Sequence, residues 1–520
     1  SFVYVIFEDG TDIYWARSRV VEYLSKLAGQ LPEGATPSIG PDATGVGWVF
    51  QYALVDPTGK YDLSEIKTFQ DWYLKYWLTS VPGVAEVTSV GGFEKQYQVE
   101  VDPNKLAALN IPIQNVISAI RESNKDVGGR TLEVSEREYY VRGLGYIKDP
   151  RELENISIGI GPGNTPVRVA DVGTVKLGPN IRRGISDFNG QGDTVGGLVV
   201  MRQGEDVSRV IDAVKDKIDE VKGAFPPGLE LEIVYDRSSL IEEAVSTLRN
   251  AILEEIVLVC AVILVFLLHI RSVLVVVITL PLSVLISMIP MYYMGISLNI
   301  MSMGGIILAV GDIVDGIIVF IENTHKKIVE SKGARSSKEL TVEACQELGP
   351  SIFSALLIIA VSFLPIFALQ AQEGKLFHPL AYTKTFAMIA AALVTITVTP
   401  PLIAYFVKGR IRSEGENPVN RWLQNSYRPI LQWCLQKTKI VLACMAALVL
   451  LSGVAFSRLG SEFMPPLWEG DLLYMPVTVP GISVTAASDL LTRQSAAIKA
   501  FPEVETVFGK AGRFETPTDA

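Results

Sequence analysis

Six long apolar stretches dominate the second half of the 520-residue chain. They lie at 252–269, 273–293, 298–321, 351–369, 381–407 and 440–457. Each is near or above the roughly 20 residues that cross a bilayer as a helix. We therefore predict six membrane-spanning helices, with a polar segment of about 245 residues before them and one of about 60 residues after them.

The first polar segment mixes strand-like alternation with helical periodicity, as small α/β units do. Helices are expected at 12–31, on both sides of a Pro-bounded turn within 101–129, and at 210–225; strands are expected at 1–10, 137–147, 165–179 and 226–236. The Gly-rich stretch at 189–197 is predicted to be a turn rather than a phosphate loop, because no Lys-Ser/Thr follows it. Since the chain begins without Met in strand-like sequence, we expect it to be an internal part of a longer protein.

A short repeat relates the two polar segments. "VPGVAEVTSVGG" at 81–92 and "FPEVETVFGKAG" at 501–512 share Pro-x-Val-x-x-Val and a Gly ten residues after the Pro. Each follows a helical stretch, so the C-terminal segment is predicted to begin a second copy of the N-terminal architecture. Chance agreement over so short a stretch is the alternative.

The third apolar stretch, "LNIMSMGGIILAVGDIVDGIIVFIE", carries three carboxylates. Asp312 and Asp315 are three residues apart and share a helix face, and Glu322 lies near the same line. A carboxylate near the bilayer centre costs about 2.5–3.5 kcal/mol, so such residues usually face a bundle interior and often mark proton or ion pathways. The alternative for Asp312 and Asp315 is a structural acid paired with a basic residue or a backbone donor.

Basic residues set the orientation of the spans, because short cytoplasmic loops carry an excess of Lys and Arg. The turn at 269–272, the loop at 325–349 and the connection at 408–439 are basic, whereas 294–297 is uncharged and 369–379 is balanced. Both large polar segments are therefore expected on the non-cytoplasmic side. An amphipathic helix near 417–437 is predicted to lie on the cytoplasmic membrane surface, with a soluble helix packed on other loops as the alternative.

Composition excludes several function classes. The formal net charge is −10 and no basic block suggests nucleic-acid binding. No P-loop is present to bind ATP. The four cysteines (Cys260, Cys345, Cys434 and Cys444) form no CxxC or Cys/His pair and are predicted to be packing residues. His269, His325 and His378 do not cluster in the sequence, so none is assigned to zinc, and no resident cofactor is expected.

Several longer stretches resemble the resistance-nodulation-division exporters, specifically their heavy-metal branch. They are 1–20, "VTSVGG" at 87–92, "YDRSSLI" at 235–241, "LNIMSMGGI" at 298–306, "VDGIIVFIEN" at 314–323, "FLPIF" at 363–367 and "EGDLLYMPVTVPGIS" at 469–483. The copper/silver (Cus-type) exporter is the most similar branch. The resemblance covers nearly the whole chain.

That resemblance implies an α-helical transmembrane bundle joined to extracytoplasmic α+β (ferredoxin-like βαβ) porter and docking subdomains. The chain would hold the end of a first porter subdomain (1–45), a second one in two parts (46–97 and 189–245), a docking insertion (98–188), six transmembrane helices (246–460) and the start of a third porter subdomain (461–520). The full protein would have twelve spans in two halves and form a homotrimer in the bacterial inner membrane. It would dock to a periplasmic adaptor and an outer-membrane channel.

The resemblance also assigns roles to single residues. Asp315 matches the family's proton-relay aspartate, while Asp312 stands where copper/silver members have a small apolar residue. Glu322, beside the basic Lys326, is expected to be structural, although it belongs to the same acidic stripe. Met475 matches a methionine of the periplasmic metal cleft, in an expected strand that places Glu469, Asp471, Leu473 and Met475 on one side.

Other methionines would line a path through the membrane. Met301 and Met388 match members of that path by the resemblance, but Ile313, Phe320 and Ile403 stand where other members would be. Soft thioethers select Cu(I), whereas carboxylates and imidazoles suit harder or borderline ions. A partial path leaves room for uptake mainly from the periplasm.

The leading hypothesis is a secondary transporter, not an enzyme, that exchanges protons for monovalent copper or silver. The alternative within transport is an exporter of divalent zinc, cobalt or nickel, which Met475 and the scarcity of histidine disfavour. A drug exporter is disfavoured because no aromatic-lined pocket is identified. A non-transporting scaffold or receptor of the same fold is disfavoured by the acidic stripe.

Overall fold

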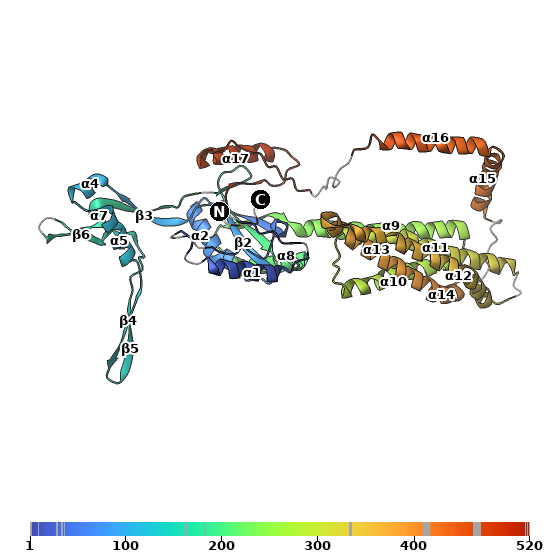
Figure 1. Ribbon diagram of the computed structural model, residues 1–520, viewed down its shortest axis with the longest axis horizontal. Coiled ribbons are helices and arrows are strands. Elements are labelled where there is room, and N and C mark those ends of the chain that lie inside the picture. Colours follow the sequence, from blue (N-terminus) through green and yellow to red (C-terminus); the bar gives the residue numbers. More distant parts are fainter. Residues whose placement is uncertain are drawn as a thin grey trace. The chain divides into compact units, whose positions relative to one another are not determined.

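The computed structural model describes all residues except 1–2, 9, 28–29, 33–34, 36, 162–163, 183, 332–334, 409–416, 461–469, 515, 517 and 519–520. It divides into two compact units (Figure 1). One unit contains Ser1–Ser239 with Gly470–Ala520, and the other contains Leu240–Glu469. We call them the α+β unit and the helical unit. Among the predicted loop charges, Lys332, Arg410 and Arg412 lie outside the described residues, as does Glu469.

A four-stranded antiparallel sheet forms the centre of the α+β unit. Its order is β11 (Glu230–Asp236), β1 (Trp48–Val55), β10 (Val195–Met201) and β2 (Val84–Gly91). The chain passes from β1 to β2 through α2 (Leu63–Phe69), a π-helical turn and α3 (Lys75–Thr79), and from β10 to β11 through α8 (Val207–Val221). Fully buried side chains such as Phe50, Tyr52 and Ile211 join the sheet to these helices.

Residues 189–194 of the predicted turn lie between β9 (Gly184–Phe188) and β10, whereas residues 195–197 of that prediction are wrong, because they begin β10. Asn189, Gly190 and Gly192 have φ of 56°, 71° and 107°, the left-handed region that Gly and Asn tolerate best. The buried Asp187 carboxylate accepts hydrogen bonds from the amides of Gly190 and Gly192. The carboxylate thus satisfies the backbone groups of the turn, as predicted for a turn rather than a phosphate loop.

A separate small core lies within the α+β unit, between 95 and 179. It contains α4 (Pro103–Ala108) and α5 (Ile113–Ser123) as predicted, with α6 (Pro150–Glu154) and α7 (Val169–Val172). The paired strands are β3 (Lys95–Val101) with β8 (Gly173–Pro179) and β6 (Ser157–Ile160) with β7 (Pro166–Arg168). The hairpin of β4 (Val127–Val134) and β5 (Arg137–Gly143) extends from this region (Figure 1), and all its residues are exposed.

Distant parts of the chain meet in the α+β unit. Strand β12 (Phe508–Gly512) pairs with β9 in antiparallel register, and α17 (Val484–Lys499) packs on both strands. The two copies of the short repeat therefore both end in a strand after a helix. The strand begins at Val84 in the first copy and at Phe508 in the second, so the two copies place their strands differently.

Two predicted strands are wrong. Residues 3–8 form no strand, and Val3 and Ile6 are 87% and 94% exposed. Residues 471–479, which include Met475, are also outside any strand, so the expected one-sided arrangement of alternate residues does not follow there. Alternation gives a chain the side-chain pattern of a strand, but a strand also needs a partner to satisfy its backbone groups. Among the described residues, no strand pairs with either of these two stretches. Helix α1 (Ile13–Lys26) forms as predicted.

The helical unit is built around a long helix, α11 (Ile300–Glu330), that matches the third apolar stretch. The described residues contain six helices long and apolar enough to cross a membrane, the number predicted. The others are α9 (Arg237–Leu267), α10 (Ile270–Tyr293), α12 (Ser337–Ser362) with the short helix η5 (Leu364–Ala368), α13 (Ala371–Thr397) and α16 (Thr438–Phe456). The predicted fifth span is interrupted, since α14 (Thr399–Phe406) follows α13 after a break at Val398, where two prolines begin the new helix.

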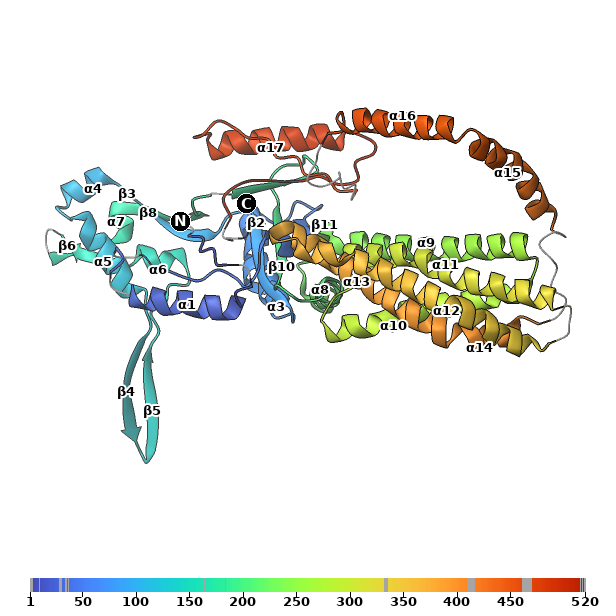
Figure 2. The same cartoon turned by 45° about the vertical axis from the view of Figure 1, so that its right-hand side comes forward.

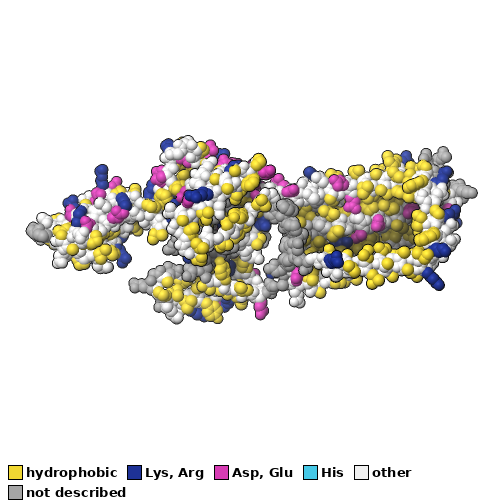
Figure 3. All heavy atoms as spheres, turned by 90° about the horizontal axis from the view of Figure 1, so that it is seen from above, with side chains coloured by type: hydrophobic (Ala, Val, Ile, Leu, Met, Phe, Trp, Pro, Cys, Tyr) yellow, Lys and Arg dark blue, Asp and Glu magenta, His cyan; other side chains and the backbone are white. Residues whose placement is uncertain are grey.

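Helix α11 packs against α10, α12 and α13 and buries fourteen of its residues. The outer surface of the helices is largely hydrophobic, with a few charged side chains among the apolar ones (Figure 3). The stretch near 417–437 forms α15 (Pro418–Gln436), which precedes α16 (Figure 2). The Asn417 side chain donates to the carbonyls of Val265 and Phe266, so the start of α15 satisfies free carbonyl groups at the end of α9.

Candidate functional site

Asp312 and Asp315 lie in the middle of α11 but in different surroundings. The Asp312 side chain is 33% exposed, whereas Asp315 lies on an exposed part of the helix surface. Residues three apart on an α-helix are about 60° apart around the axis, which is enough to separate a packed side from an open one. The spacing of the two aspartates places them on neighbouring positions of one helix face, but Asp312 is partly buried and Asp315 is exposed.

A buried lysine faces Asp312. Lys384 lies on α13, its side chain is 10% exposed, and its Nζ is 3.1 Å from Asp312 Oδ2. The same Nζ lies 4.3 Å from the centre of the Phe363 ring, a favourable cation–π geometry. Asp312 Oδ2 is buried and makes no hydrogen bond of normal angle to any described residue, so its contact with Lys384 is chiefly Coulombic.

Close packing of α11 on α13 places this ion pair. A Cβ on Gly305 would lie 2.1 Å from Thr383 Oγ1 and 2.6 Å from the Leu380 carbonyl oxygen, so any side chain there would force the helices apart. Small residues permit such backbone approach between membrane helices. Thr383 precedes Lys384, and the approach therefore brings the lysine against α11.

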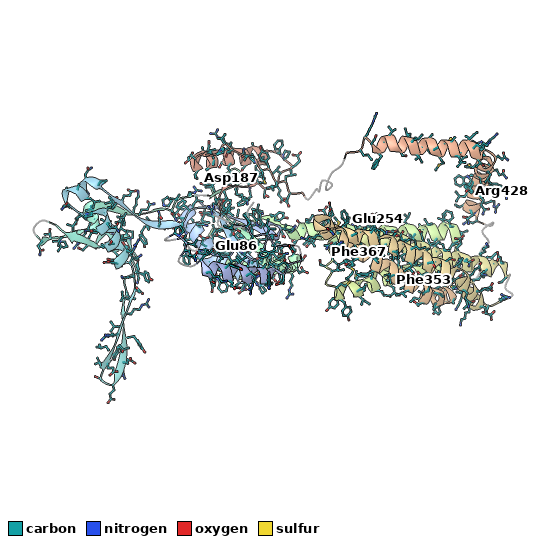
Figure 4. The ribbon with its side chains drawn as sticks, viewed as in Figure 1. Glu86, Asp187, Glu254, Phe353, Phe367 and Arg428 are labelled. Carbon is teal, nitrogen blue, oxygen red and sulfur yellow. The ribbon has the colours of Figure 1, made fainter. Side chains whose placement is uncertain are left out.

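Asp315 has no salt bridge or hydrogen bond to the residues that the structure describes. A further carboxylate lies one turn away: Glu255 Oε1 on α9 is 3.4 Å from the position a Cβ on Gly311 would take. Gly311 and Asp315 are four residues apart and occupy the same side of α11. Glu255 follows Glu254, which Figure 4 labels on α9.

The described charged residues near the middle of α11 include three carboxylates and one lysine. They are Asp312, Asp315, Glu255 and Lys384. Lys384 compensates Asp312, while Glu255 and Asp315 lie toward the other side of α11. Charges in an apolar bundle interact more strongly than in water because the effective dielectric constant is lower. Asp312 therefore lies beside a cation, whereas Asp315 lies on the same side of α11 as a second carboxylate.

Glu322 lies two turns beyond Asp315 and lines a cavity of about 610 Å³. The cavity extends along α11 from Ile318 to Glu330, is lined by the end of α9 and the start of α15, and is partly open. His325 and Lys326 share its wall with Glu322. Glu322 thus borders a space large enough to hold several water molecules.

Two histidines that are far apart in the sequence meet near the end of the bundle. The ring centres of His269 and His325 are 5.2 Å apart, and each ring has a nitrogen 2.8 Å from Ser272 Oγ. The two histidines do not cluster in the sequence. Only the packing of α10 on α11 reveals that they interact.

The candidate metal ligands lie in three environments. Met388 on α13 is fully buried and Met301 on α11 is half-buried, whereas Met475 in the α+β unit is 68% exposed. Ile313, Phe320 and Ile403 are all buried in the core of the helical unit. Within the described part of the chain, no group of three or more His, Cys, Asp and Glu side chains is arranged to hold a metal ion.

Sequence reasoning missed Lys384 and Glu255. A signal existed for each, because Lys384 lies inside the fifth predicted span and Glu255 inside the first, and charged residues within spans deserve the same scrutiny as the aspartates. Nothing in the sequence indicated which aspartate the lysine would meet, or that His269 and His325 share a serine.

The model of the AcrB/AcrD/AcrF family matches residues 1–520. Among curated relatives, the cation efflux system proteins SilA of Salmonella typhimurium and CusA of Escherichia coli K12 are each 47% identical to the chain. The cobalt-zinc-cadmium resistance protein CzcA of Cupriavidus metallidurans is 34% identical. Each comparison covers 100% of this chain and 50% of the relative, so the chain spans about half the length of the curated relatives it matches.

Solved structures agree with this result. Two crystal forms of a heavy metal efflux pump match with TM-scores of 0.81 and 0.83 at 31% identity. Each match covers 99% of this chain and 49% of the other.

Proposed function

Because the chain belongs to the AcrB/AcrD/AcrF family, we propose that it forms half of a proton-driven exporter of monovalent copper or silver in a bacterial inner membrane. The expected membership of the resistance-nodulation-division exporters is confirmed. Its relatives are efflux proteins rather than enzymes. The proposal for this chain is a metal/proton antiporter with no resident cofactor.

The observation that carries the proposal is that, of two aspartates on α11, one has an ion-pair partner and the other has none among the described residues. Asp312 has a lysine 3.1 Å away, while Asp315 has no ion-pair partner in the described chain. By the family resemblance, the exposed side of α11 that carries Asp315 would face the second half of a longer protein. Asp315 then binds a proton in one conformation and releases it in another.

Proton coupling supplies the driving force. Moving one elementary charge inward is worth about 2.3 kcal/mol per 100 mV of membrane potential. A ligand shifts a conformational equilibrium only through its different affinity for the two states. The protonation of Asp315 biases the bundle between two conformations in this way. The charge of Asp312 modifies the pH at which Asp315 takes up its proton. Glu322 has a structural role on the wall of the cavity beside α11.

The metal is assigned from thioether chemistry and from the closer relatives. Met475 is the proposed periplasmic ligand, and Met301 and Met388 are proposed members of a membrane path. The 47% identity to SilA and CusA exceeds the 34% identity to the relative named for cobalt, zinc and cadmium. A divalent-cation exporter is the second candidate, which the presence of that relative supports.

The subdomains follow from the same family assignment. The sheet order β11-β1-β10-β2 with its two crossing helical connections supports a ferredoxin-like porter subdomain formed by 46–97 and 189–245. Residues 98–188 form the proposed docking insertion, and 461–520 begin the third porter subdomain. In the full protein these parts serve a homotrimer that docks to a periplasmic adaptor and an outer-membrane channel.

Metal-resistance profiling tests the proposal. The full-length gene is expressed in a metal-sensitive bacterial host, and growth is measured against copper, silver and zinc. Protection against copper and silver is expected, and Met475→Ile should remove most of it because a branched alkyl group offers no soft donor. Protection against zinc alone, unaffected by this change, would replace the leading function by the divalent alternative.

The matched control is Val477→Ile. Val477 lies two residues from Met475 in the same extended stretch and is 97% exposed. It offers no metal-binding atom, so its substitution should leave resistance unchanged. A protein that gives no resistance to any of these metals would favour a non-transporting role.

A further inference from the structure

A chain of hydrogen-bonding groups leads from inside the helical unit toward its surface. His325 Nε2 and His269 Nδ1 each lie 2.8 Å from Ser272 Oγ. His269 Nε2 is 3.4 Å from the Lys408 carbonyl oxygen. Ser272 is fully buried, His325 is 5% exposed and His269 is half-buried. One end of this chain is therefore enclosed, and the other is open to solvent.

Counting donors and acceptors fixes where the hydrogens lie in the neutral state. The Lys408 carbonyl only accepts, so His269 donates from Nε2, and its Nδ1 is then an acceptor. Ser272 consequently donates its one hydroxyl proton to His269, and His325 donates to Ser272 from Nε2. All three hydrogen bonds point the same way, from His325 toward Lys408.

The enclosed end borders the cavity beside α11. His325 lines this cavity, and Ile318, one turn past Asp315, lines its other end. The volume of about 610 Å³ and the polar side chains of Glu322 and Lys326 suit a chain of water molecules. Water there would connect the neighbourhood of Asp315 to His325.

We propose that His325, Ser272 and His269 form a relay that releases protons to the cytoplasm. This deepens the proposed function, because it supplies the second half of an inward proton path whose first acceptor is Asp315. Imidazole and hydroxyl groups both donate and accept, which lets them pass a proton without leaving their positions.

One passage through the relay conserves protons. A proton from cavity water binds His325 Nδ1, the Nε2 proton of that ring moves to Ser272 Oγ, and the serine proton moves to His269 Nδ1. His269 then releases its Nε2 proton to cytoplasmic water. One proton enters and one leaves. Before the next passage each ring must lose its Nδ1 proton and take one up at Nε2, and the hydroxyl must turn back; this reset leaves the number of protons on each ring unchanged.

The surroundings of His269 favour release of a proton by its ring over retention of that proton. Burial lowers the pKa of His269 most, the positive charge of Arg271 lowers it further, and the Lys408 carbonyl opposes them. On α11, the charged residues Lys326, Glu322 and Glu330 line the same cavity as His325. His269 therefore stays mainly neutral at neutral pH and holds an arriving proton only briefly.

Ser272→Ala tests the relay because it removes only the central hydroxyl. The full-length protein is studied in everted membrane vesicles, whose outer face is the cytoplasmic face, and metal-coupled proton movement is measured while the bath pH is varied. We expect at least about a tenfold loss of rate, since groups that transfer protons typically contribute that much or more. Ser272→Thr, which keeps a hydroxyl, should restore most of the rate and its dependence on bath pH.

Ser287→Ala is the matched control. Ser287 is another fully buried serine of α10, and its hydroxyl bonds only to the Val284 carbonyl of the same helix. This variant should keep the wild-type rate. A Ser272→Ala protein that moves metal and protons at the wild-type rate over the whole pH range would overturn the relay.

A second measurement separates the relay from the proposed function. Nitrogen NMR of labelled histidine, assigned with His269→Gln and His325→Gln, should show both rings as neutral Nε2–H forms, and Ser272→Ala should remove this preference. Fixed tautomers without metal-coupled proton movement in the wild type would refute the proposed function and the relay's role in it. Coupled transport with no fixed tautomers would refute the relay alone.

Discussion

Two of the chain's lysine–aspartate pairs, Lys215–Asp236 and Lys384–Asp312, differ in their surroundings. In the α+β unit, Lys215 Nζ lies 2.6 Å from Asp236 Oδ2, and in the helical unit Lys384 Nζ lies 3.1 Å from Asp312 Oδ2. Side-chain exposure is 36% for Lys215 and 20% for Asp236, against 10% for Lys384 and 33% for Asp312. The chemical groups are the same, but the hydrogen bonds around them are not.

Asp236 belongs to a complete network. Its Oδ1 accepts from the Ser238 amide at 2.9 Å and from the Ser238 hydroxyl at 2.6 Å, and Lys215 also contacts that hydroxyl at 3.2 Å. Asp236 ends β11 and precedes α9 directly, so its carboxylate satisfies the free amide of Ser238 at the start of the helix. This pair fixes the junction between strand and helix.

Asp312 has a far simpler environment. Its contact with Lys384 lacks hydrogen-bond geometry, and the lysine lies over the Phe363 ring. A pair held by charge alone in an apolar bundle is strong while both charges exist and costly when one is lost. A carboxylate whose hydrogen bonds are all made, like that of Asp236, suits a junction that does not move. An ion pair without further hydrogen bonds, like that of Asp312 and Lys384 near the unpaired Asp315, suits a site whose protonation changes.

The largest effect on metal export should come from Asp315→Asn, because Asp315 is the acid without an ion-pair partner among the described residues. It removes the proposed proton acceptor while changing little volume, so metal export should be abolished with the protein still folded and inserted. Export is measured by metal accumulation in cells, and insertion by protease accessibility of the membrane fraction. Asp312→Asn is the matched variant, for which we expect a shifted pH profile with export retained. Unchanged export by Asp315→Asn would contradict the assignment.

Breaking the ion pair between Lys384 and Asp312 should have the next largest effect. Lys384→Met leaves Asp312 without its cation, and we expect a loss of about 2 kcal/mol of stability, less than for a completely buried pair because Asp312 is partly exposed. The thermal midpoint of the detergent-solubilised full-length protein reports this loss. Adding Asp312→Asn should recover much of it, since the uncompensated charge disappears. Equal or additive losses would show that the two side chains are not coupled.

The smallest effect should come from the pair in the α+β unit. Lys215→Met should cost about 1 kcal/mol, because Ser238 continues to hydrogen-bond the aspartate and water reaches the site. The full-length protein and its Asp236→Asn and double variants give the coupling energy by the same thermal assay. A coupling larger than that of Lys384 with Asp312 would reverse the comparison.

Acid provides a pH test of the same pair. Burial alone would raise the pKa of Asp236, but hydrogen bonds from Lys215 and Ser238 prevail and lower it. A lowered folded-state pKa stabilises the protein above the unfolded value of about 4, and this contribution is lost as pH falls further through the folded-state pKa. Asp236→Asn should therefore reduce the loss of stability below about pH 4. An acid response identical to that of the wild type would exclude this contribution.

Local pattern was enough for most of the elements. The six apolar stretches, the two helices around the Pro-bounded turn and the turn at 189–194 were predicted because length, periodicity and Gly content are properties of neighbouring residues. Residues 3–8 and 471–479 were predicted wrongly as strands because pairing depends on segments far away in the chain. The break at Val398 was missed, although Pro400 and Pro401 marked it.

The sequence by itself determined that three acids lie on one apolar helix long enough to cross a membrane. It also indicated four candidate site residues: Asp315, Met475, Met301 and Met388. Only the tertiary structure decided which acid is paired. Gly305 lets α13 approach closely enough to bring Lys384 to Asp312, and the packing of α10 on α11 joins His269 to His325 through Ser272. Periodicity assigns a residue to a side of its own helix, but the charge or hydrogen bond that meets it comes from another helix, and close packing in three dimensions makes that choice.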